Sequence, residues 1–391
     1  MTTDGSIYEG RLRWGGDEEA FWGDYFNGSK AGNLWAAQVP SEQLIWREPV
    51  VLFGAAIFQR TGSIDLDRPF MARFGDIARI EAGERDIQVT LKSGTVIGLD
   101  RYDADDLADG LRVWDTSRGV VDLDEWAIRR VEFLPAPEQG AVPERLHGTV
   151  QTAEGDFTGF VQWDQREGVG TGELDGFSSD AERHVRFDSI AAIARDSRDS
   201  SVVTLLDGSE VVLSGREVGE GNRGIYVDDR RYGRVLIFWR TFERVDFSPG
   251  ASGPAFDDFP PGQPLAGRVT TRDGRRLEGR LVYDLDESET VETLDARSRG
   301  VNYNIPFGLI ASILLPGPDE TRAGRANVVL HSGETLELEM TGDLAAGTAG
   351  MSIFGVGSAG PEYVPWIDVA SIEFDRPTMM YPSMSSLSGG R

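Results

Sequence analysis

The chain of 391 residues contains no cysteine and only three histidines. The lack of cysteine excludes disulfides, thiolate nucleophiles, zinc–thiolate sites and iron–sulfur clusters. No two of His147, His184 and His331 have the spacing of a chelating pair. We therefore expect neither a metal site nor a cofactor.

Basic residues and long hydrophobic runs are also scarce. There are 39 lysines and arginines against 65 aspartates and glutamates, which gives a formal net charge of −26. Such a surface repels phosphate backbones and argues against a nucleic-acid partner. No segment approaches the roughly 18 uninterrupted apolar residues of a membrane span. We expect no transmembrane span, whereas peripheral association with a membrane complex is compatible with this composition.

A hydrophobic pattern occurs three times. The frame Phe-x-x-Ile-x-x-Ile occupies residues 74–80, 187–193 and 307–313, at intervals of 113 and 120 residues. Each copy is followed by a similar closing stretch that begins at Trp126, Trp239 or Trp366. With the turn-like context of most of the 48 glycines, this predicts an all-β chain of three tandem repeats. The predicted boundaries are 1–134, 146–248 and 265–376, followed by a flexible tail at 377–391.

Each repeat is predicted to hold two small meander-like or barrel-like halves. Glu154-Gly155 and Asp273-Gly274 are placed to form tight turns between strands, and the Phe-x-x-Ile frame suits one helical turn followed by a strand. Residues 268–313 show the order glycine, strand, Asp-Gly turn, Gly-Arg-Leu-x-Tyr-Asp, Ile-Pro-Phe and Ile-x-x-Ile. This order resembles the Sm-like and SH3-like small barrels. The resemblance implies a bent five-stranded sheet and carries over no functional residue.

The first repeat begins in the middle of its expected opening strand. Aligning Gly10 with Gly159 places Met1 opposite Val150. Either the strand is short or replaced, or residues upstream were removed, as when a secretory signal peptide is trimmed. The second interpretation favours an extracytoplasmic location, in the periplasm or cell envelope, and the first is compatible with the cytoplasm.

The first repeat also carries an insertion, at about residues 15–70. It adds about 36 residues relative to the other repeats and is rich in aromatic side chains. The spacing of Phe21, Trp22, Tyr25 and Phe26 predicts one face of a short helix. These rings either cover a barrel face or a domain junction, or form a partner-binding surface. The candidate partner-binding residues are Phe21, Trp22, Tyr25, Phe26, Trp35 and Trp46.

Catalytic and metal-binding patterns are weak, and we expect no catalytic residue. No Gly-x-Ser-x-Gly nucleophile elbow is present, and no carboxylate pair stands out by spacing. Acidic runs at 103–110 and 284–289 do not match the twelve-residue calcium loop, so we expect solvated loop carboxylates there.

The function that these patterns favour is a non-enzymatic scaffold or accessory subunit. It would bind another macromolecule, for example as an extrinsic part of an envelope or membrane-associated assembly. One alternative is a carbohydrate- or ligand-binding module in which Trp22, Trp35 and Trp46 stack on the ligand. The other is a hydrolase that uses paired carboxylates.

Overall fold

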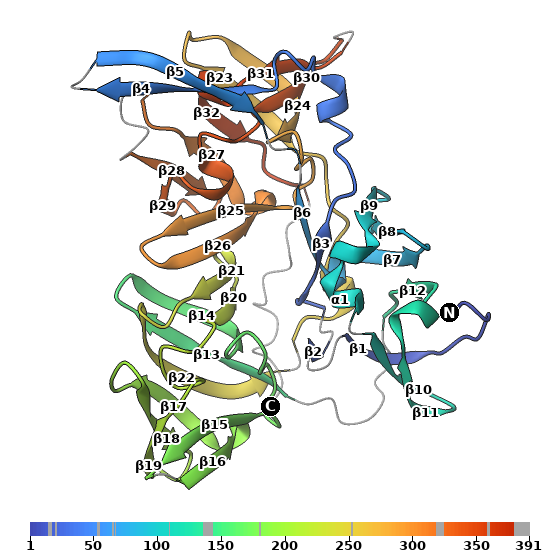
Figure 1. The fold of residues 1–391 in the computed structure, drawn as a ribbon, viewed down its shortest axis with the longest axis vertical. Coiled ribbons are helices and arrows are strands. Elements are labelled where there is room, and N and C mark those ends of the chain that lie inside the picture. The colour runs from blue at the N-terminus through green and yellow to red at the C-terminus, as the bar shows by residue number, and fades with distance from the viewer. Residues whose placement is uncertain are drawn as a thin grey trace.

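The computed structural model describes residues 1–14, 18–19, 22–52, 55–64, 66, 68–108, 110–135, 144–179, 181–251, 253–317, 324–357 and 360–378. Within these residues the chain is all-β, with antiparallel strands, short 3-10 turns and a single helical turn, α1 (Asp105–Ala108). The all-β prediction is confirmed. We call residues 1–134, 146–248 and 265–376 the first, second and third segments. The third lies above the second along the long axis, and the first lies beside them (Figure 1).

The first segment contains three small sheets and a separate hairpin. Its strands are β1 (Gly10–Trp14), β2 (Glu18–Glu19), β3 (Tyr25–Ser29), β4 (Ile45–Leu52), β5 (Ala55–Ser63), β6 (Pro69–Arg73), β7 (Ile77–Ala82), β8 (Asp86–Leu91), β9 (Val96–Asp100), β10 (Leu111–Asp115), β11 (Gly119–Leu123) and β12 (Arg130–Glu132). Its 3-10 turns are η1 (Ala36–Gln38), η2 (Phe74–Asp76), η3 (Arg101–Asp103) and η4 (Glu125–Ala127). The insertion, at about residues 15–70, includes β2 to β5 and carries the β4–β5 hairpin to the third segment (Figure 1).

The second and third segments have corresponding element orders. The second contains β13 (Arg145–Thr152), β14 (Gly155–Gln162), β15 (Glu173–Ser178), β16 (Ala181–Arg186), η5 (Phe187–Ser189), β17 (Ile190–Arg195), β18 (Ser200–Leu205), β19 (Glu210–Ser214), β20 (Ile225–Asp229), β21 (Gly233–Ile237) and β22 (Phe242–Ala251). After η6 (Phe256–Asp258), the third contains β23 (Ala266–Thr271), β24 (Arg276–Tyr283), β25 (Thr293–Ser298), β26 (Val301–Pro306), η7 (Phe307–Leu309), β27 (Ile310–Leu314), β28 (Arg325–Leu330), β29 (Thr335–Glu339), η8 (Gly342–Leu344), β30 (Met351–Phe354), β31 (Glu362–Val364), η9 (Trp366–Asp368) and β32 (Val369–Phe374).

The recurring Phe-x-x-Ile-x-x-Ile frame forms a helical turn and then a strand in all three places. Its phenylalanine opens η2, η5 or η7, and the next strand starts at the first isoleucine. In the first segment Phe74, Ile77 and Ile80 are all buried. The 3-10 turn places the phenylalanine inside. The two isoleucines both face inward because each strand has a register shift between them, at Ile77/Arg79 in the first segment and at the corresponding residues of the other two. The predicted local structure is confirmed.

The two halves of each of these segments interlock. In the second segment β14 pairs with β13 of its own half and with β20 of the other half, and β19 pairs with both β18 and β15. In the third, β24 likewise pairs with β23 and β30. The halves are therefore not the separate meanders that the sequence pattern suggested. The shared strand order is compatible with a repeated unit, and the three-repeat interpretation stays a prediction.

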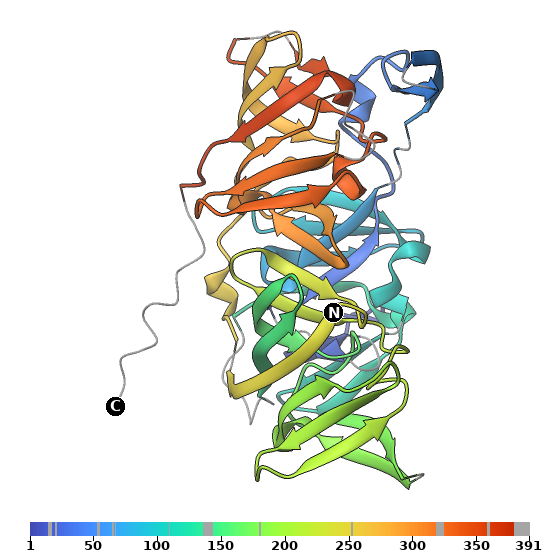
Figure 2. The same cartoon turned by 90° about the vertical axis from the view of Figure 1, so that its left-hand side faces the viewer.

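The second and third segments share a sheet. β21 pairs with β26, with Arg234 opposite Asn304 and Ile237 opposite Val301, and this pairing makes one sheet of twelve strands. One cluster of buried hydrophobic residues extends from Leu146 to Phe374. The second and third segments therefore share one hydrophobic interior. Figure 2 shows the strands of both segments stacked along the long axis. The first segment keeps a hydrophobic cluster of its own.

Candidate functional site

Tyr25 and Phe26, two of the predicted partner-binding residues, belong to the interior. They begin β3, which pairs with β6, so the predicted helical face is wrong in its described part. Backbone pairing with β6 places successive side chains on opposite sides of the strand. Phe26 is completely buried against Trp14, with ring centroids 5.4 Å apart. Tyr25 is buried beneath the Arg234 guanidinium, 4.5 Å from its ring centroid.

Trp22 lies between the first segment and the connection to the third segment. Its ring centroid is 6.2 Å from that of Phe133 and 4.8 Å from that of Phe256 in η6. Lys92 donates hydrogen bonds to the carbonyl oxygens of Phe256 and Phe259, at 2.6 and 3.0 Å. The connection between the second and third segments is thus held against the first segment where the structure describes it.

Trp35 packs against the third segment. Its ring centroid lies 5.8 Å from that of Phe354, and the Arg280 guanidinium lies 5.1 Å from it. Phe21 lies outside the described residues, and Trp46 belongs to β4 but its side chain is outside the described part. The described members of the predicted aromatic set therefore lie in the core of the first segment or in contacts between segments.

Two cations of the insertion reach acidic residues of the third segment. Lys30 Nζ lies 2.7 Å from Asp286 Oδ1 and 3.4 Å from Glu292 Oε1. Arg68 Nη2 lies 3.3 Å from Asp284 Oδ1. Burial lowers the pKa of Lys30, but the carboxylates of Glu292 and Asp286 outweigh this effect and the net shift is upward. The insertion is therefore attached to the third segment by charge as well as by packing.

The acidic run at 284–289 is buried, so the expectation of solvated loop carboxylates is wrong there. Asp284 and Asp286 are each 6% exposed and Glu289 is 5% exposed. Burial raises the pKa of Asp284 to about 6, against the opposing effect of Arg68. Burial also raises the pKa of Glu287 and Asp343 well above the usual range. In the other run, at 103–110, Asp106 accepts a hydrogen bond from the Asn27 backbone N–H at 2.6 Å, and Asp109 lies outside the described residues.

A second ionic contact joins the first and second segments. Asp24 Oδ1 lies 2.9 Å from Arg145 Nη2 and 3.2 Å from Arg234 Nη2. Asp228 contacts the same two arginines, at 3.6 and 2.8 Å. Two guanidinium groups and two carboxylates balance in charge, so this group is a structural junction between segments. No sequence spacing pointed to it, because its members come from strands and loops far apart in the chain.

His184 occupies a cross-strand position, opposite Asp175. His184 Nδ1 lies 2.7 Å from Asp175 Oδ1, and hydrogen bonding to Asp175 raises the pKa of His184. With Glu173 these residues form the single group of metal-ligating atoms found among the described residues, and all three are exposed. Asn304 and Asp295 make the same kind of cross-strand contact in the third segment. This correspondence favours a structural pair over a metal site.

His147 and Ser248 also contact each other, with 2.6 Å between His147 Nδ1 and Ser248 Oγ. They face each other on β13 and β22. Burial lowers the pKa of His147, and Arg230 and Arg145 add to this effect. Among the described residues no carboxylate hydrogen bonds to His147. The pair therefore lacks the third group that orients a catalytic base.

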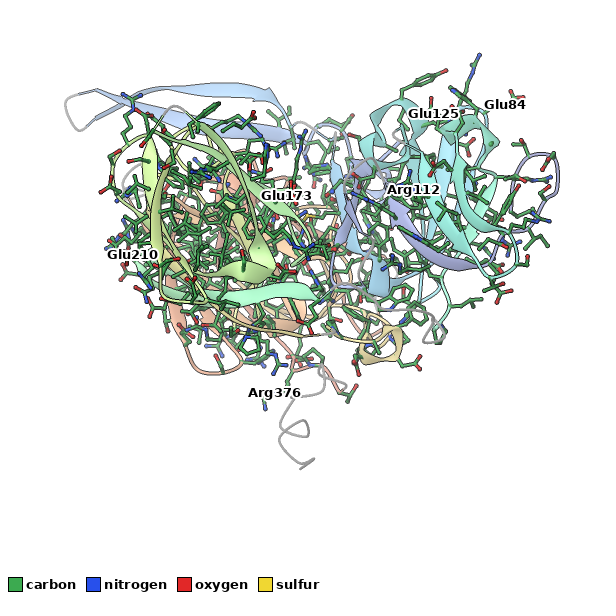
Figure 3. The ribbon with its side chains drawn as sticks, turned by 90° about the horizontal axis from the view of Figure 1, so that it is seen from below. Glu84, Arg112, Glu125, Glu173, Glu210 and Arg376 are labelled. Carbon is green, nitrogen blue, oxygen red and sulfur yellow. The ribbon has the colours of Figure 1, made fainter. Side chains whose placement is uncertain are left out.

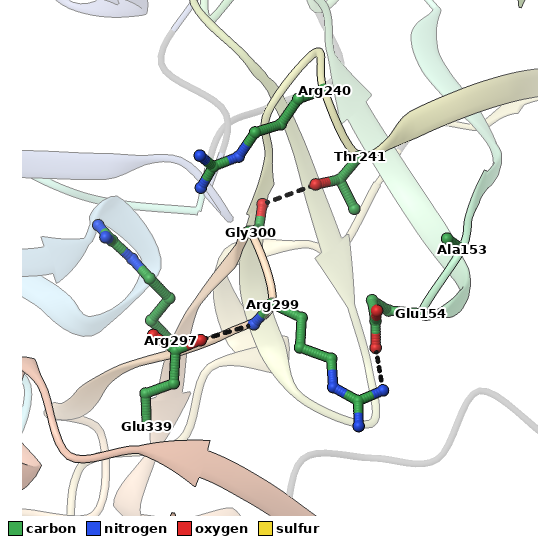
Figure 4. A pocket seen from close by; sticks show the side chains of 8 residues that line it. All are labelled: Ala153, Glu154, Arg240, Thr241, Arg297, Arg299, Gly300 and Glu339. Atoms are coloured by element: carbon green, nitrogen blue, oxygen red, sulfur yellow. Dashed lines mark hydrogen bonds and ion pairs between the residues drawn. The ribbon is translucent and has the colours of Figure 1, made fainter. Parts of the chain in front are cut away.

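A hollow lies where the second and third segments meet (Figure 4). It has a volume of about 430 Å³. We call it the arginine hollow; its lining residues are Ala153, Glu154, Arg240, Thr241, Arg297, Arg299, Gly300 and Glu339. Apart from Glu154, which belongs to a predicted turn, none of these residues carried a sequence signal. They lie in turns or near strand ends, and only the β21–β26 pairing brings them together.

Comparisons with models of protein families, with curated proteins and with solved structures each found no match. The Sm-like and SH3-like resemblance therefore stays a prediction. Among the described residues, no helix has the length and apolar character needed to cross a membrane.

Proposed function

We propose that this chain is a non-enzymatic scaffold or accessory subunit that binds a protein partner by strand addition at β16. The observation that carries the proposal is the contrast between two equivalent sheet edges. β16 is the last strand of the twelve-stranded sheet, and five of its six side chains are exposed. β26 is the corresponding strand of the third segment, since each is the second strand of a hairpin and is followed by a 3-10 turn. The outer edge of β26 is covered, because β21 pairs with it.

The β21–β26 ladder supports the view that this edge accepts a further strand. Four residue pairs join the two strands in antiparallel register, from Arg234–Asn304 to Ile237–Val301. In the second segment the residues that correspond to 301–304 are 181–184, and their outer edge has no ladder partner among the described strands. An exposed edge offers backbone N–H and C=O groups to an incoming strand, which is a common mode of protein recognition.

The side chains at this end of the sheet favour a selective partner. Glu182, Arg183 and Arg186 place charges of both signs along β16. Charged edges oppose indiscriminate pairing and admit a strand of complementary charge. On the neighbouring strands, Phe177 and Val212 are 50% and 52% exposed. Figure 3 shows Glu173 and Glu210 of the second segment away from Glu84 and Glu125 of the first. We therefore expect a partner with a mixed-charge strand flanked by an apolar side chain.

The test uses a proline substitution at the edge. Proteins recovered with the full chain are purified one by one and titrated against the wild type and against Glu182→Pro and Glu182→Ala. Glu182 corresponds to Asn302, which lies opposite Leu236 in the β21–β26 ladder, so its backbone N–H belongs to the outer edge of β16. Proline removes that donor and is tolerated where the N–H of an edge strand faces solvent. We expect binding of the true partner to weaken by about tenfold or more, about 1.4 kcal/mol, in Glu182→Pro only.

Two further measurements make that result decisive. The melting temperature of Glu182→Pro must stay close to that of the wild type. The outward-facing amides of β16, at residues 182, 184 and 186, should gain protection from hydrogen exchange in the complex. Protection at another surface, or unchanged affinity in a folded Glu182→Pro variant, contradicts the proposal. Location in an envelope or membrane-associated assembly stays part of the proposal, and fractionation of the native cells tests it.

The alternatives fit the geometry less well. The Trp22 and Trp35 rings contact Phe256 and Phe354 inside the molecule, which leaves them poorly placed to stack on a sugar. The carboxylates of Asp284 and Asp286 are paired with Arg68 and Lys30, so they are poorly suited to serve as a hydrolytic acid and base.

A further inference from the structure

We propose that the arginine hollow binds a small anion through phosphate or carboxylate oxygens. This inference goes beyond the proposed function and is independent of it. The hollow is formed by four pieces of chain: the β13–β14 turn, the β21–β22 connection, the β25–β26 hairpin and the end of β29. It depends on the shared sheet, since two of these pieces belong to the second segment and two to the third.

The charges in the hollow do not balance. Three guanidinium groups and two carboxylates line it. Glu154 pairs with Arg299, with 2.8 Å between Oε2 and Nη1, and Glu339 accepts the Arg299 backbone N–H at 2.9 Å. Both carboxylates are therefore directed to Arg299. A surplus positive charge remains, on a chain whose net charge is −26.

The guanidinium groups of Arg240 and Arg297 are paired with neither carboxylate of the hollow. Among the described residues neither forms an ion pair, and Arg297 donates only a neutral hydrogen bond, from Nε to Asn302 Oδ1 at 2.8 Å. The two side chains extend to the same side of the hollow, away from Glu154 (Figure 4). Guanidinium groups present N–H donors in a fixed planar fork that matches the oxygens of a carboxylate or phosphate. An anion between them would neutralise both.

Gly300 leaves space for the Arg240 side chain. Gly300 has a φ of +91°, which favours glycine, and a Cβ there would lie 3.3 Å from Arg240 Nε. It would also press on the hydroxyl of Thr241, which donates to the Gly300 carbonyl at 3.4 Å. A side chain at position 300 would therefore crowd the Arg240 side chain at the edge of the hollow.

The ligand should be small and polar. The side chains around the hollow are charged or small, without an aromatic or large aliphatic group. A volume of about 430 Å³ exceeds what a single inorganic phosphate needs and is within the range of small-molecule sites. Because the rest of the surface is acidic, long-range attraction of an anion is weak, and binding must come from contacts inside the hollow.

The experiment measures binding of three probes by calorimetry: inorganic phosphate, pyrophosphate and citrate, each against sodium chloride at equal ionic strength. We expect at least one probe to bind the wild type. Binding should weaken by about tenfold or more in R240A/R297A, which corresponds to 1.4 kcal/mol or more. The double variant R230A/R276A removes the same charge from exposed arginines outside the hollow and should bind as the wild type does. Phosphate and citrate distinguish the two oxyanion classes.

A third double variant separates geometry from charge. R240K/R297K keeps both positive charges but loses the planar forks, so we expect affinity between that of the wild type and R240A/R297A. Equal loss in R240A/R297A and R230A/R276A overturns the proposal, because it would show a general effect of net charge. Absence of binding beyond chloride in the folded wild type also overturns it. Melting temperatures of all variants verify that the sheet junction is intact.

Discussion

Lys30 Nζ and Asp286 Oδ1 lie 2.7 Å apart, although 256 residues separate them in the chain. The two side chains are 11% and 6% exposed. This contact fastens the insertion of the first segment to the third segment, and the Glu292 carboxylate lies 3.4 Å from the same ammonium group. The insertion therefore has a structural role: it holds the first segment against the third.

Replacing Lys30 by methionine should destabilise the fold. Methionine keeps most of the apolar volume but leaves Asp286 and Glu292 without their nearest cation. Removing one partner of a buried ion pair costs about 3–5 kcal/mol. We expect a loss of about that size in the free energy of unfolding, measured by urea denaturation.

The control for Lys30→Met is Arg276→Met, at an exposed position in β24. It should change the free energy of unfolding by less than about 0.5 kcal/mol. The double variant Lys30→Met with Asp286→Asn should recover part of the loss, because the unpaired charge is removed. Equal stability of Lys30→Met and Arg276→Met would show that the contact is not formed in solution.

The buried carboxylates predict an unusual pH dependence. Burial raises the pKa of Asp284 to about 6, above the value of about 3.9 expected in the unfolded chain. The native state thus holds the proton more firmly than the unfolded state. The stabilisation is complete below about pH 4 and is lost as pH rises through 6. We expect the free energy of unfolding to fall by about 1–3 kcal/mol between pH 4 and 7 from this group.

Denaturant titrations at pH 4.5, 5.5, 6.5 and 7.5 measure this effect. Asp284→Asn should reduce the slope, since asparagine still accepts the Ala349 backbone N–H but does not titrate. A smaller slope of the same sign should remain, because burial also raises the pKa of Glu287 and Asp343. Asp273→Asn is the matched control: its carboxylate is exposed, and hydrogen bonding from Thr271 lowers the Asp273 pKa. That variant should keep the wild-type slope over this range. A wild-type profile that rises from pH 4.5 to 7.5 and is unaffected by Asp284→Asn would contradict the prediction.

The sequence was sufficient for the local structure and for the fold class. The helical turn and strand at Phe74, Ile77 and Ile80 follow from local spacing. The register shift that turns both isoleucines inward is seen only in the strand pairing. The turn at Gly274 could also be predicted, and its φ of +87° is the conformation that glycine adopts at no steric cost.

The candidate sites could not be predicted, because they depend on which strands meet. Lysine and aspartate usually lie on the surface, so nothing in the sequence marks Lys30 and Asp286 as buried. Only the docking of the insertion on the third segment buries them. Arg240 and Arg297 come together only because β21 pairs with β26. The aromatic spacing that includes Tyr25 and Phe26 fits one face of a helix. The pairing of β3 with β6 places these two residues in a strand instead, because tertiary contacts can override a local preference.

Gly75 should be intolerant of a larger side chain. A Cβ at this position would overlap the ring of Phe259, which is 5% exposed and lies on the connection between the second and third segments. Gly75→Ala should therefore displace that connection and cost about 1–3 kcal/mol, as overpacking of a close contact does. Thermal unfolding and limited proteolysis near residues 253–262 are the measurements. Gly32→Ala, where a Cβ meets nothing within 4 Å, should leave both unchanged.

Trp22 and Trp35 should be needed for stability more than for binding. Trp22 packs against Phe256 and Trp35 against Phe354, so each joins the first segment to another part of the chain. Truncation of a tryptophan in such a contact removes a large apolar area and leaves a gap. We expect Trp22→Ala and Trp35→Ala each to lose about 2–4 kcal/mol of unfolding free energy.

The control for both tryptophan variants is Leu206→Ala, since Leu206 is 70% exposed and its truncation should leave the melting temperature within about one degree. Partner affinity is measured in parallel, at a temperature where every variant is folded. If Trp22→Ala or Trp35→Ala keeps the wild-type melting temperature and loses the partner, that ring belongs to a binding surface. A lowered melting temperature with affinity retained places it in the junction between segments, because only the packing inside the chain has then been disturbed.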